Sequence, residues 1–437
     1  MVPWFNQVVY FTFSINMIIG IIWMVLKRKI SSFDTVHGLN HIQKSYLIPY
    51  SIIHIGGLIQ QPYIYQRYIE CGFSHEKIAM IHVYSYASTA VFSVFAGFLL
   101  KKLGHAKFLS LLCLQLSFSS ALKQFSSYFL IAVSSCIMSF SMPSIIMVLS
   151  DWWLRAESLL YDKEKSHFIF NENHSFLNMM LHIAITPISG FSSHKWGTLF
   201  IFRICPIIFL ISILFVLVYL NKFQFNIARN SSKSDIKSIF KVLSSSKGSL
   251  IMTVLDISLM LSNFLWMRRI YGQFSKMNSK PSLSFISGSF GIAGLIGALF
   301  SESLSTLFSK ELYLFFGLLI QGILISLSFL YADQKTLVFI CDFFVFFLHH
   351  SLDPSLLILR KINYPDNLRG YLMSLTRIPV SIFSCIITWI TRNSENNYPV
   401  LYSGISLIAA SVFALILSFI KSSHKDDEDS LLESTTE

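Results

Sequence analysis

The stretch KFQFNIARNSSKSDIKSIFKVLSSSK, residues 222–247, is the longest polar segment of a chain that is otherwise strongly apolar. It is rich in serine and basic residues, which is typical of a cytoplasmic linker between membrane-spanning segments. On either side of it lie two parts of similar length, residues 46–221 and 248–421, and each holds six long hydrophobic blocks. The linker therefore predicts a fold made of two six-helix bundles.

The hydrophobic blocks indicate a membrane protein. The chain of 437 residues is 53% hydrophobic and only 13% charged, with a mean hydropathy of +0.59. A helix needs roughly 20 apolar residues to cross the hydrocarbon core of a bilayer. We predict an all-α polytopic membrane protein with spans at 5–26, 46–66, 78–100, 107–124, 128–150, 174–193, 198–221, 248–267, 282–303, 312–331, 336–357, 371–390 and 400–420.

The first block is predicted to be an additional N-terminal helix that is not cleaved. No basic residues precede it, as they would in a signal peptide, and Lys27, Arg28 and Lys29 follow it. If the N-terminus is outside, most of the 34 lysines and arginines fall in cytoplasmic segments. The net charge of +11 is then a consequence of topology, and no nucleic-acid partner is expected.

Five parts follow from this pattern. They are an N-terminal helix with a basic loop (1–45), the first bundle (46–221), the linker (222–247), the second bundle (248–421) and an acidic, disordered cytoplasmic tail (422–437). In the tail, the run from Asp427 to Leu432 matches an acidic di-leucine sorting pattern. A trafficking adaptor would bind this pattern. We expect the protein to reside in the plasma membrane or in an endosomal or vacuolar membrane.

The sequence offers no catalytic chemistry. No nucleophile–base motif, phosphate loop or dinucleotide fingerprint stands in a suitable context, so an enzyme is not expected. The six cysteines have no CxxC spacing, and the histidines show no convincing metal-ligand spacing with a carboxylate. We predict no metal and no cofactor. Paired bundles are instead a common architecture of secondary transporters, with a solute site between the halves.

Arg377, in the run SLTRIPVS at 374–381, is the most unusual residue of the apolar blocks. It lies about 9 Å inside the predicted span 371–390, at 1.5 Å per residue. One interpretation is an anchor whose long side chain extends to the interface. The other is an anion ligand, because a guanidinium matches the geometry of an oxyanion. Pro379 would remove a helix hydrogen bond beside it.

Other ionisable residues of the spans differ in depth. Arg203, Glu302, Asp342 and Asp353 lie near predicted span ends, where side chains reach interfacial water. Asp256 lies near the middle of its span, so it must be paired, protonated or hydrated. We predict that it is a proton carrier or a gating partner, although a structural role is the alternative.

The glycines at 288, 291, 294 and 297 recur every third residue in one block. This spacing predicts a smooth stripe along one side of a helix, where another backbone packs closely.

Six segments of the chain together resemble one known family. Two of them are QQPYIYQRYIECGFSHEKIA and YASTAVFSVFAGFLLKKLG, and the others contain matching residues: Lys123 in ALKQFSSYFL, Trp153 and Glu157 in LSDWWLRAE, Asp256 and Trp266 in LDISLMLSNFLW, and Arg377 in the run 353–381. The family that they resemble is the molybdate-anion transporter family of the major facilitator superfamily, which also has an additional N-terminal helix. Asp151 stands where the family has a glutamate.

The resemblance implies a major facilitator fold that transports a small solute, with oxyanions such as molybdate as the substrate class. Arg377 would supply positive potential to the site. Tyr63, Tyr65 and Thr376 would supply hydrogen bonds, and Asp151 and Asp256 would act in gating or proton coupling. The lipid bilayer and an anionic small molecule are thus the expected partners.

The chain departs from the superfamily at several positions. In the loop after the second bundle helix, Lys101, His105 and Ala106 replace the usual acidic and basic residues. An arginine expected in the fourth bundle helix falls at Ser135, and a glutamate expected in the tenth falls at Phe346. These changes leave two alternatives open: a diverged facilitator for another nutrient or metabolite, and a receptor or scaffold that does not transport.

Overall fold

The computed structural model describes residues 2–31, 38–157, 159–160, 163–222, 246–275, 283–305, 307–364, 372–373, 375–392 and 398–434. Within these residues every regular element is a helix, and thirteen of the helices are long. The all-α prediction and the division into two bundles with one additional helix are confirmed. The predicted linker falls almost entirely on residues 223–245, which lie outside the described ranges.

The first bundle follows the N-terminal helix α1 (Val2–Ser31). Its elements are α2 (Leu39–Gln60), η1 (Gln61–Tyr63), α3 (Ile64–Glu70), α4 (His75–Leu103), α5 (His105–Leu122), α6 (Tyr128–Glu157), α7 (Lys163–Trp196), α8 (Thr198–Tyr219) and η2 (Leu220–Lys222). The second bundle consists of α10 (Lys247–Ser275), α11 (Leu283–Ser305), α12 (Lys310–Leu330), α13 (Lys335–Asn363), α15 (Arg377–Ile390) and α16 (Tyr398–Ser434).

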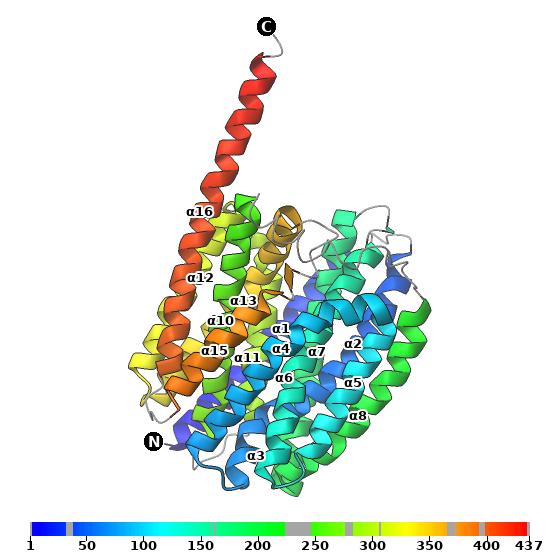
Figure 1. Cartoon of the computed structure of the whole chain (residues 1–437), viewed down its shortest axis with the longest axis vertical. Helices are drawn as coiled ribbons and strands as arrows, with labels where there is room; N and C mark the ends of the chain where they lie inside the picture. The colour runs from blue at the N-terminus through cyan, green and yellow to red at the C-terminus, as the bar shows by residue number, and fades with distance from the viewer. Residues whose placement is uncertain are drawn as a thin grey trace.

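The two bundles repeat one packing scheme. In the first, α2 packs against α7 and α8, α5 against α6 and α8, and α4 against α6. In the second, α10 packs against α15 and α16, α12 against α13 and α16, and α11 against α13. Helices at equivalent positions in the two bundles make equivalent contacts, so the chain contains an internal structural repeat. The bundles lie side by side with the termini at opposite ends of the molecule (Figure 1).

Two helix pairs join the halves: α4 with α15, and α7 with α11. Further contacts lie at the end of the molecule that carries α3. There α3 contacts α10, the Tyr86 ring stacks on Phe264 at 5.8 Å, and Arg392 Nε lies 3.7 Å from Glu76 Oε1. The halves therefore contact each other at this end as well as along α4–α15 and α7–α11.

Helix α1 belongs to the first part of the chain but packs mainly against the second bundle. Its buried residues Phe5, Val9, Phe13 and Asn16 lie on one face at helical spacing. Phe13 meets the Phe285 ring of α11 edge-on at 5.2 Å. The same helix approaches α7 where Gly20 faces Met179. Helix α1 thus covers the junction between α7 and α11.

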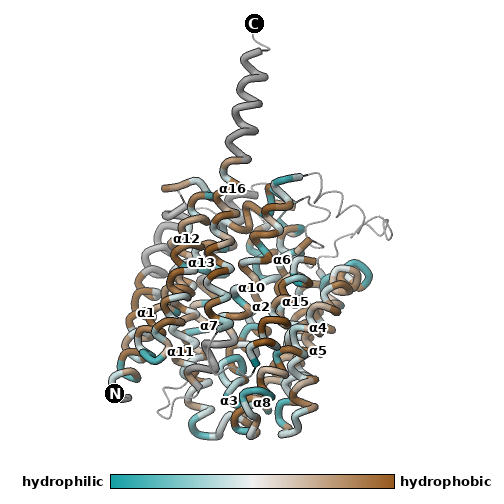
Figure 2. Tube along the Cα trace, turned by 60° about the vertical axis from the view of Figure 1, so that its left-hand side comes forward, coloured by the Kyte–Doolittle hydropathy of each residue, from teal (hydrophilic) through white to brown (hydrophobic). Residues whose placement is uncertain are grey.

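The molecule has the polarity expected in a bilayer. Large apolar side chains are exposed on the outer faces of the helices, whereas many serines and threonines are buried. Figure 2 shows hydrophobic residues along the lengths of the helices and hydrophilic residues mainly at the two ends. Among the described helices, nine are long and apolar enough to cross a membrane, and α15 is a shorter apolar helix. Helices α2 and α7 are more polar and carry histidines on their inner faces.

Several helices extend beyond their predicted spans, among them α6 to Glu157, α7 from Lys163 and α10 to Ser275, and two further differences concern the ends of α13 and α16. Helix α13 continues to Asn363, beyond the predicted span end at 357, because Arg360 finds a buried partner and does not need to leave the membrane. Helix α16 runs through to Ser434, so residues 422–434 are helical where a disordered tail was predicted. This segment contains neither glycine nor proline, and its two leucines, two glutamates and one lysine are residues that favour a helix.

The glycine stripe of α11 winds around the helix and does not form one seam. A Cβ at Gly288 would meet Thr186 and Phe13, and one at Gly291 would meet the ring of His182. A Cβ at Gly297 would overlap the backbone carbonyl of Phe347 in α13. Close backbone approach is thus found at Gly297, whereas other positions make room for side chains.

Replacing Gly297 by valine is expected to destabilise the protein by about 1–3 kcal/mol or more, because the branched side chain has no space against the α13 backbone. The thermal unfolding midpoint of the purified protein in detergent measures this. Ala87→Val is the matched control, since Ala87 is exposed on the outer face of α4. Equal midpoints for the two variants would contradict the close packing of α11 and α13.

Candidate functional site

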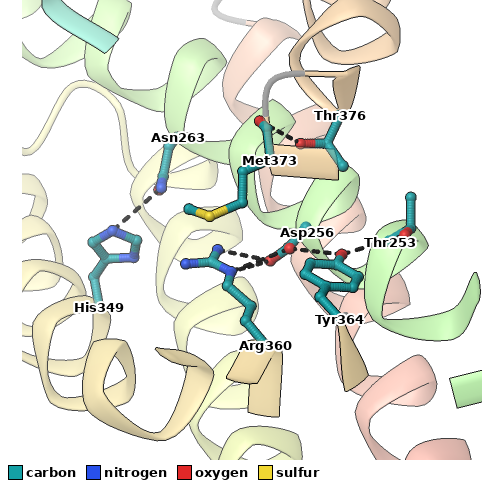
Figure 3. Close-up of polar contacts among 8 residues, drawn as sticks. All are labelled: Thr253, Asp256, Asn263, His349, Arg360, Tyr364, Met373 and Thr376. Carbon is teal, nitrogen blue, oxygen red and sulfur yellow. Dashed lines mark hydrogen bonds and ion pairs between the residues drawn. The ribbon is translucent and has the colours of Figure 1, made fainter. Parts of the chain in front are cut away.

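A buried ion pair lies in the second bundle between α10 and the last turn of α13 (Figure 3). Arg360 donates to both carboxylate oxygens of Asp256: Nη2 lies 2.7 Å from Oδ1, and Nε lies 3.0 and 3.1 Å from Oδ1 and Oδ2. Asp256 is fully buried, whereas the Arg360 side chain is 15% exposed. Asp256 is therefore paired, which is one of the alternatives stated for this residue.

Tyr364 completes the pair from the residue that follows α13. Its hydroxyl donates to Asp256 Oδ2 at 3.0 Å and lies 3.3 Å from Thr253 Oγ1. Burial, together with the negative charge of Asp256, raises the pKa of the Tyr364 hydroxyl above its usual range. It stays protonated and serves as a donor, so that Asp256 accepts hydrogen bonds on both oxygens.

Arg377 is the first residue of α15 and is only 6% exposed. An anchor that extends to the lipid–water interface would be exposed, so that interpretation of Arg377 is wrong. Within the described residues no carboxylate pairs with it, and the nearby charge that acts on it is that of Arg360. Arg360 is thus neutralised by Asp256, whereas the charge of Arg377 has no carboxylate partner among the described residues.

The backbone before α15 is also helical: Leu372, Met373 and Leu375 are in helical conformation, and Thr376 N donates to the Leu372 carbonyl at 3.0 Å. The break at Thr376 lies one turn before Pro379, which has no N–H to donate to the carbonyl of the preceding turn. Thr376 precedes the helix and is buried, and its hydroxyl donates to the Met373 carbonyl at 3.0 Å (Figure 3). Thr376 and Arg377 therefore lie together at a short break in helical backbone.

Tyr63 and Tyr65 lie elsewhere. Tyr63 is in η1, where its buried hydroxyl donates to the Ser189 carbonyl of α7 at 3.4 Å. Tyr65 is in α3 and packs in an apolar cluster with Tyr68 and Ile131. Both are in the first bundle, at the end that carries α3 (Figure 1). The structure does not bring them together with Thr376 and Arg377.

Asp151 lies in a second charged cluster, where α5 begins beside α6. His105 Nε2 lies 2.8 Å from Asp151 Oδ2, and Arg155 Nε donates to the same oxygen at 2.8 Å. The cluster joins two helices of the first bundle. His105 occupies a position at which the superfamily usually has an arginine, so a different residue provides the charge contact of this loop.

Asp342 was predicted to reach the membrane–water interface because it lies near a span end, but its side chain is buried inside the protein. It is 1% exposed and accepts hydrogen bonds from Trp266 Nε1 at 3.0 Å and from Ser328 Oγ at 3.3 Å. Arg203 is exposed, as expected, and the Asp353 side chain is half-exposed and 3.0 Å from His350 Nδ1. The side chain of Glu302 lies outside the described residues. Asp342 thus joins α10, α12 and α13 in the core of the second bundle.

Arg360 and Tyr364 are the polar residues of this site that sequence reasoning did not select. Arg360 lies outside the predicted span 336–357, because the hydropathy of the block falls after residue 357. The signal was the sequence LLILRKIN at 356–363, in which the apolar helical pattern continues around the charge. In the described ranges, no group of three His, Cys, Asp or Glu side chains is arranged to hold a metal ion.

Paired six-helix bundles with charged groups buried between helices define a polytopic transporter of the facilitator type. Residues 7–332 match the family described as sugar transporters with 12 transmembrane segments, and the chain belongs to this family of major facilitator transporters. It is a membrane transporter, not an enzyme. The matched range ends before α13, so the family match does not include Arg360 or Arg377. Comparison with curated proteins found no match.

Solved structures of the same superfamily have the same fold. The nucleoside transporter NupG superposes with a TM-score of 0.60 at 11% identity, covering 87% of this chain and 99% of NupG. The fucose:proton symporter FucP of E. coli gives 0.58 at 13% identity, covering 86% and 97%. A bacterial homologue of the iron transporter ferroportin, in an inward-facing state, gives 0.62 at 14%, covering 87% and 100%. At these identities the similarity concerns the fold alone.

Proposed function

We propose that this transporter carries a small anion, an oxyanion such as molybdate, by alternating access. The observation that supports the proposal is Arg377: a buried guanidinium without a carboxylate partner among the described residues, at the N-terminus of α15. An isolated buried charge is costly unless a counter-charge accompanies it.

The neighbouring ion pair gives the anion a second contact. Arg360 acts electrostatically on Arg377 and is held by Asp256. An anion bound at Arg377 would attract Arg360 and weaken its contact with Asp256. In this proposal Thr376 contributes a hydrogen bond, and Asp256 is the gating partner. Tyr63 and Tyr65, which contact other helices of the first bundle, are no longer proposed as ligands.

Asp151 is proposed to act in gating at a different place. It links the start of α5 to α6 through His105 and to the next turn of α6 through Arg155. His105 begins α5 directly after the end of α4, and α4 packs against α15 across the halves. Its release would therefore loosen one of the two surfaces on which the halves move.

Uptake of labelled molybdate into proteoliposomes tests the proposal. We expect uptake above that of empty vesicles, competed by sulfate and unaffected by a neutral hexose. Absence of uptake by correctly inserted, monodisperse protein would contradict it.

A neutral polyhydroxylated solute is the second candidate. The family description favours it, and so do neutral groups with buried, unpaired polar atoms among the described residues, such as His54 Nε2 and Asn178 Oδ1. Uptake of labelled hexose that molybdate does not compete with would support this candidate instead. If neither solute is transported, the alternative of a receptor or scaffold would be favoured.

We also propose that the protein resides in the plasma membrane or in an endosomal or vacuolar membrane, and that an adaptor binds the di-leucine pattern. Residues 427–432, which form this pattern, lie in the C-terminal turns of α16.

A further inference from the structure

Three histidines from both halves converge beside α11. His182 of α7 faces Gly291, and His350 of α13 faces Gly294, one turn further along α11. The ring of His54 in α2 lies 5.8 Å from that of His182. His350 is close enough to interact electrostatically with both. We call His54, His182 and His350 the seam histidines, because α7 and α11 form one of the two contacts between the halves.

Glycine at positions 291 and 294 is what admits these rings. A Cβ at either position would overlap an imidazole, so α11 provides space where two histidines of different halves come together. Within the described residues His54 Nε2 is buried and has no hydrogen-bond partner. A buried imidazole nitrogen without a partner is a group that gains by binding a proton or by donating one.

His350 also has a connection to the solvent-accessible side of the protein. Its Nδ1 lies 3.0 Å from Asp353 Oδ2, and the two side chains are 40% and 50% exposed. The adjacent His349 lies 3.2 Å from Asn263 Nδ2 of α10, beside the Arg360–Asp256 pair (Figure 3). The histidine cluster thus extends from an exposed carboxylate to the neighbourhood of the anion site.

We propose that the seam histidines are the proton-binding site of this transporter, and that their protonation loosens the α7–α11 contact. A proton on His350 Nδ1 would pair with the Asp353 carboxylate 3.0 Å away. The charged ring would then lie beside α11 near the buried rings of His54 and His182 of the other half, and the cost of keeping it dehydrated there would favour opening of the α7–α11 contact. The titratable and charged groups around this site are Tyr50 and His54 on α2, His174 and His182 on α7, and His349, His350, Asp353 and Arg360 on α13.

The proposal depends on the transporter fold and not on the identity of the solute, so its main test uses no solute. Spin labels at Lys102→Cys of α4 and Lys361→Cys of α13 report the separation of the halves, in protein whose six native cysteines are replaced. Both positions are exposed. We expect the populations of the label distances to change roughly tenfold between about pH 8 and about pH 5, a typical size for coupled equilibria.

The variant His54→Gln/His182→Gln/His350→Gln should lose this pH response, whereas His194→Gln, at an exposed position of α7, should keep it. His350→Gln alone is the milder variant if the triple variant does not fold. This single variant should shift the pH midpoint of the change in label distances. A wild-type protein without a pH response would overturn the proposal, and so would a seam variant that responds like wild type.

A second readout uses molybdate as the probe. Seam variants should lose uptake driven by a pH gradient but retain molybdate exchange without a gradient, because exchange needs the solute site alone. If molybdate is not transported at all, the proposed substrate fails, and the distance measurement still decides on the proton site. Equal loss of exchange and of gradient-driven uptake would show that these histidines only support the fold.

Discussion

Arg377→Ala is expected to reduce molybdate uptake by roughly ten- to a hundredfold, since a hydrogen bond to a charged group contributes about 1.5–3 kcal/mol. The side chain is buried and has no acidic partner in the described part of the chain, so its removal leaves no carboxylate unpaired. The protein should therefore fold and insert normally while its affinity for the anion falls. Initial rates over a range of molybdate concentrations measure the effect.

Two further variants make this result specific. Arg377→Lys keeps the charge but loses the planar donor pair, and should retain part of the activity with a raised KM. Arg203→Ala is the matched control, because Arg203 also lies in a membrane helix but is exposed. If Arg377→Ala transports like wild type, the buried guanidinium has a structural role and the anion proposal fails.

Breaking the Asp256–Arg360 pair is expected to give the largest loss of stability. Removing one partner leaves a buried charge uncompensated, which typically costs about 3–5 kcal/mol. Asp256→Asn and Arg360→Met should each lower the thermal unfolding midpoint strongly. The double variant should be more stable than either single variant, because neither charge then remains. Tyr364→Phe should lower the unfolding midpoint less, since it removes only the hydrogen bond from the Tyr364 hydroxyl to Asp256.

Transport assays on the same variants separate stability from gating. If Asp256 only neutralises Arg360, the double variant should recover uptake together with stability. If Asp256 is a gating partner, the double variant should be stable and still defective in uptake. If the stability losses of the two single variants simply add in the double variant, the result would contradict the coupling between the Asp256 and Arg360 side chains.

The sequence predicted the architecture well because hydropathy and charge bias report the membrane directly. It was less informative about the site, for physical reasons that individual residues illustrate. Arg360 was missed because a hydropathy window registers the charge and not the partner, and Asp256 lies 104 residues away in the chain. Tyr63 and Tyr65 were selected by resemblance, yet their surroundings in the first bundle depend on tertiary packing.

The depth of a residue along a helix was a poor guide to its environment. Asp342 lies near a span end and is nevertheless enclosed by Trp266 and Ser328. Arg377 lies at a similar depth in its own segment, and it too is covered by neighbouring helices. Which side of a helix faces the bundle interior decides the environment, and that depends on contacts between segments distant in the sequence.

Helix α1 gives the molecule an unusual connectivity. It precedes α2 in the chain but docks on α11, so the N-terminal part of the polypeptide carries a segment that is embedded in the other half. The two halves are consequently joined through residues 32–37 as well as through the central linker. If the chain is cut between residues 222 and 246, the first fragment keeps α1, which packs on α11 of the second fragment. We therefore expect the two halves, made separately, to associate through this helix.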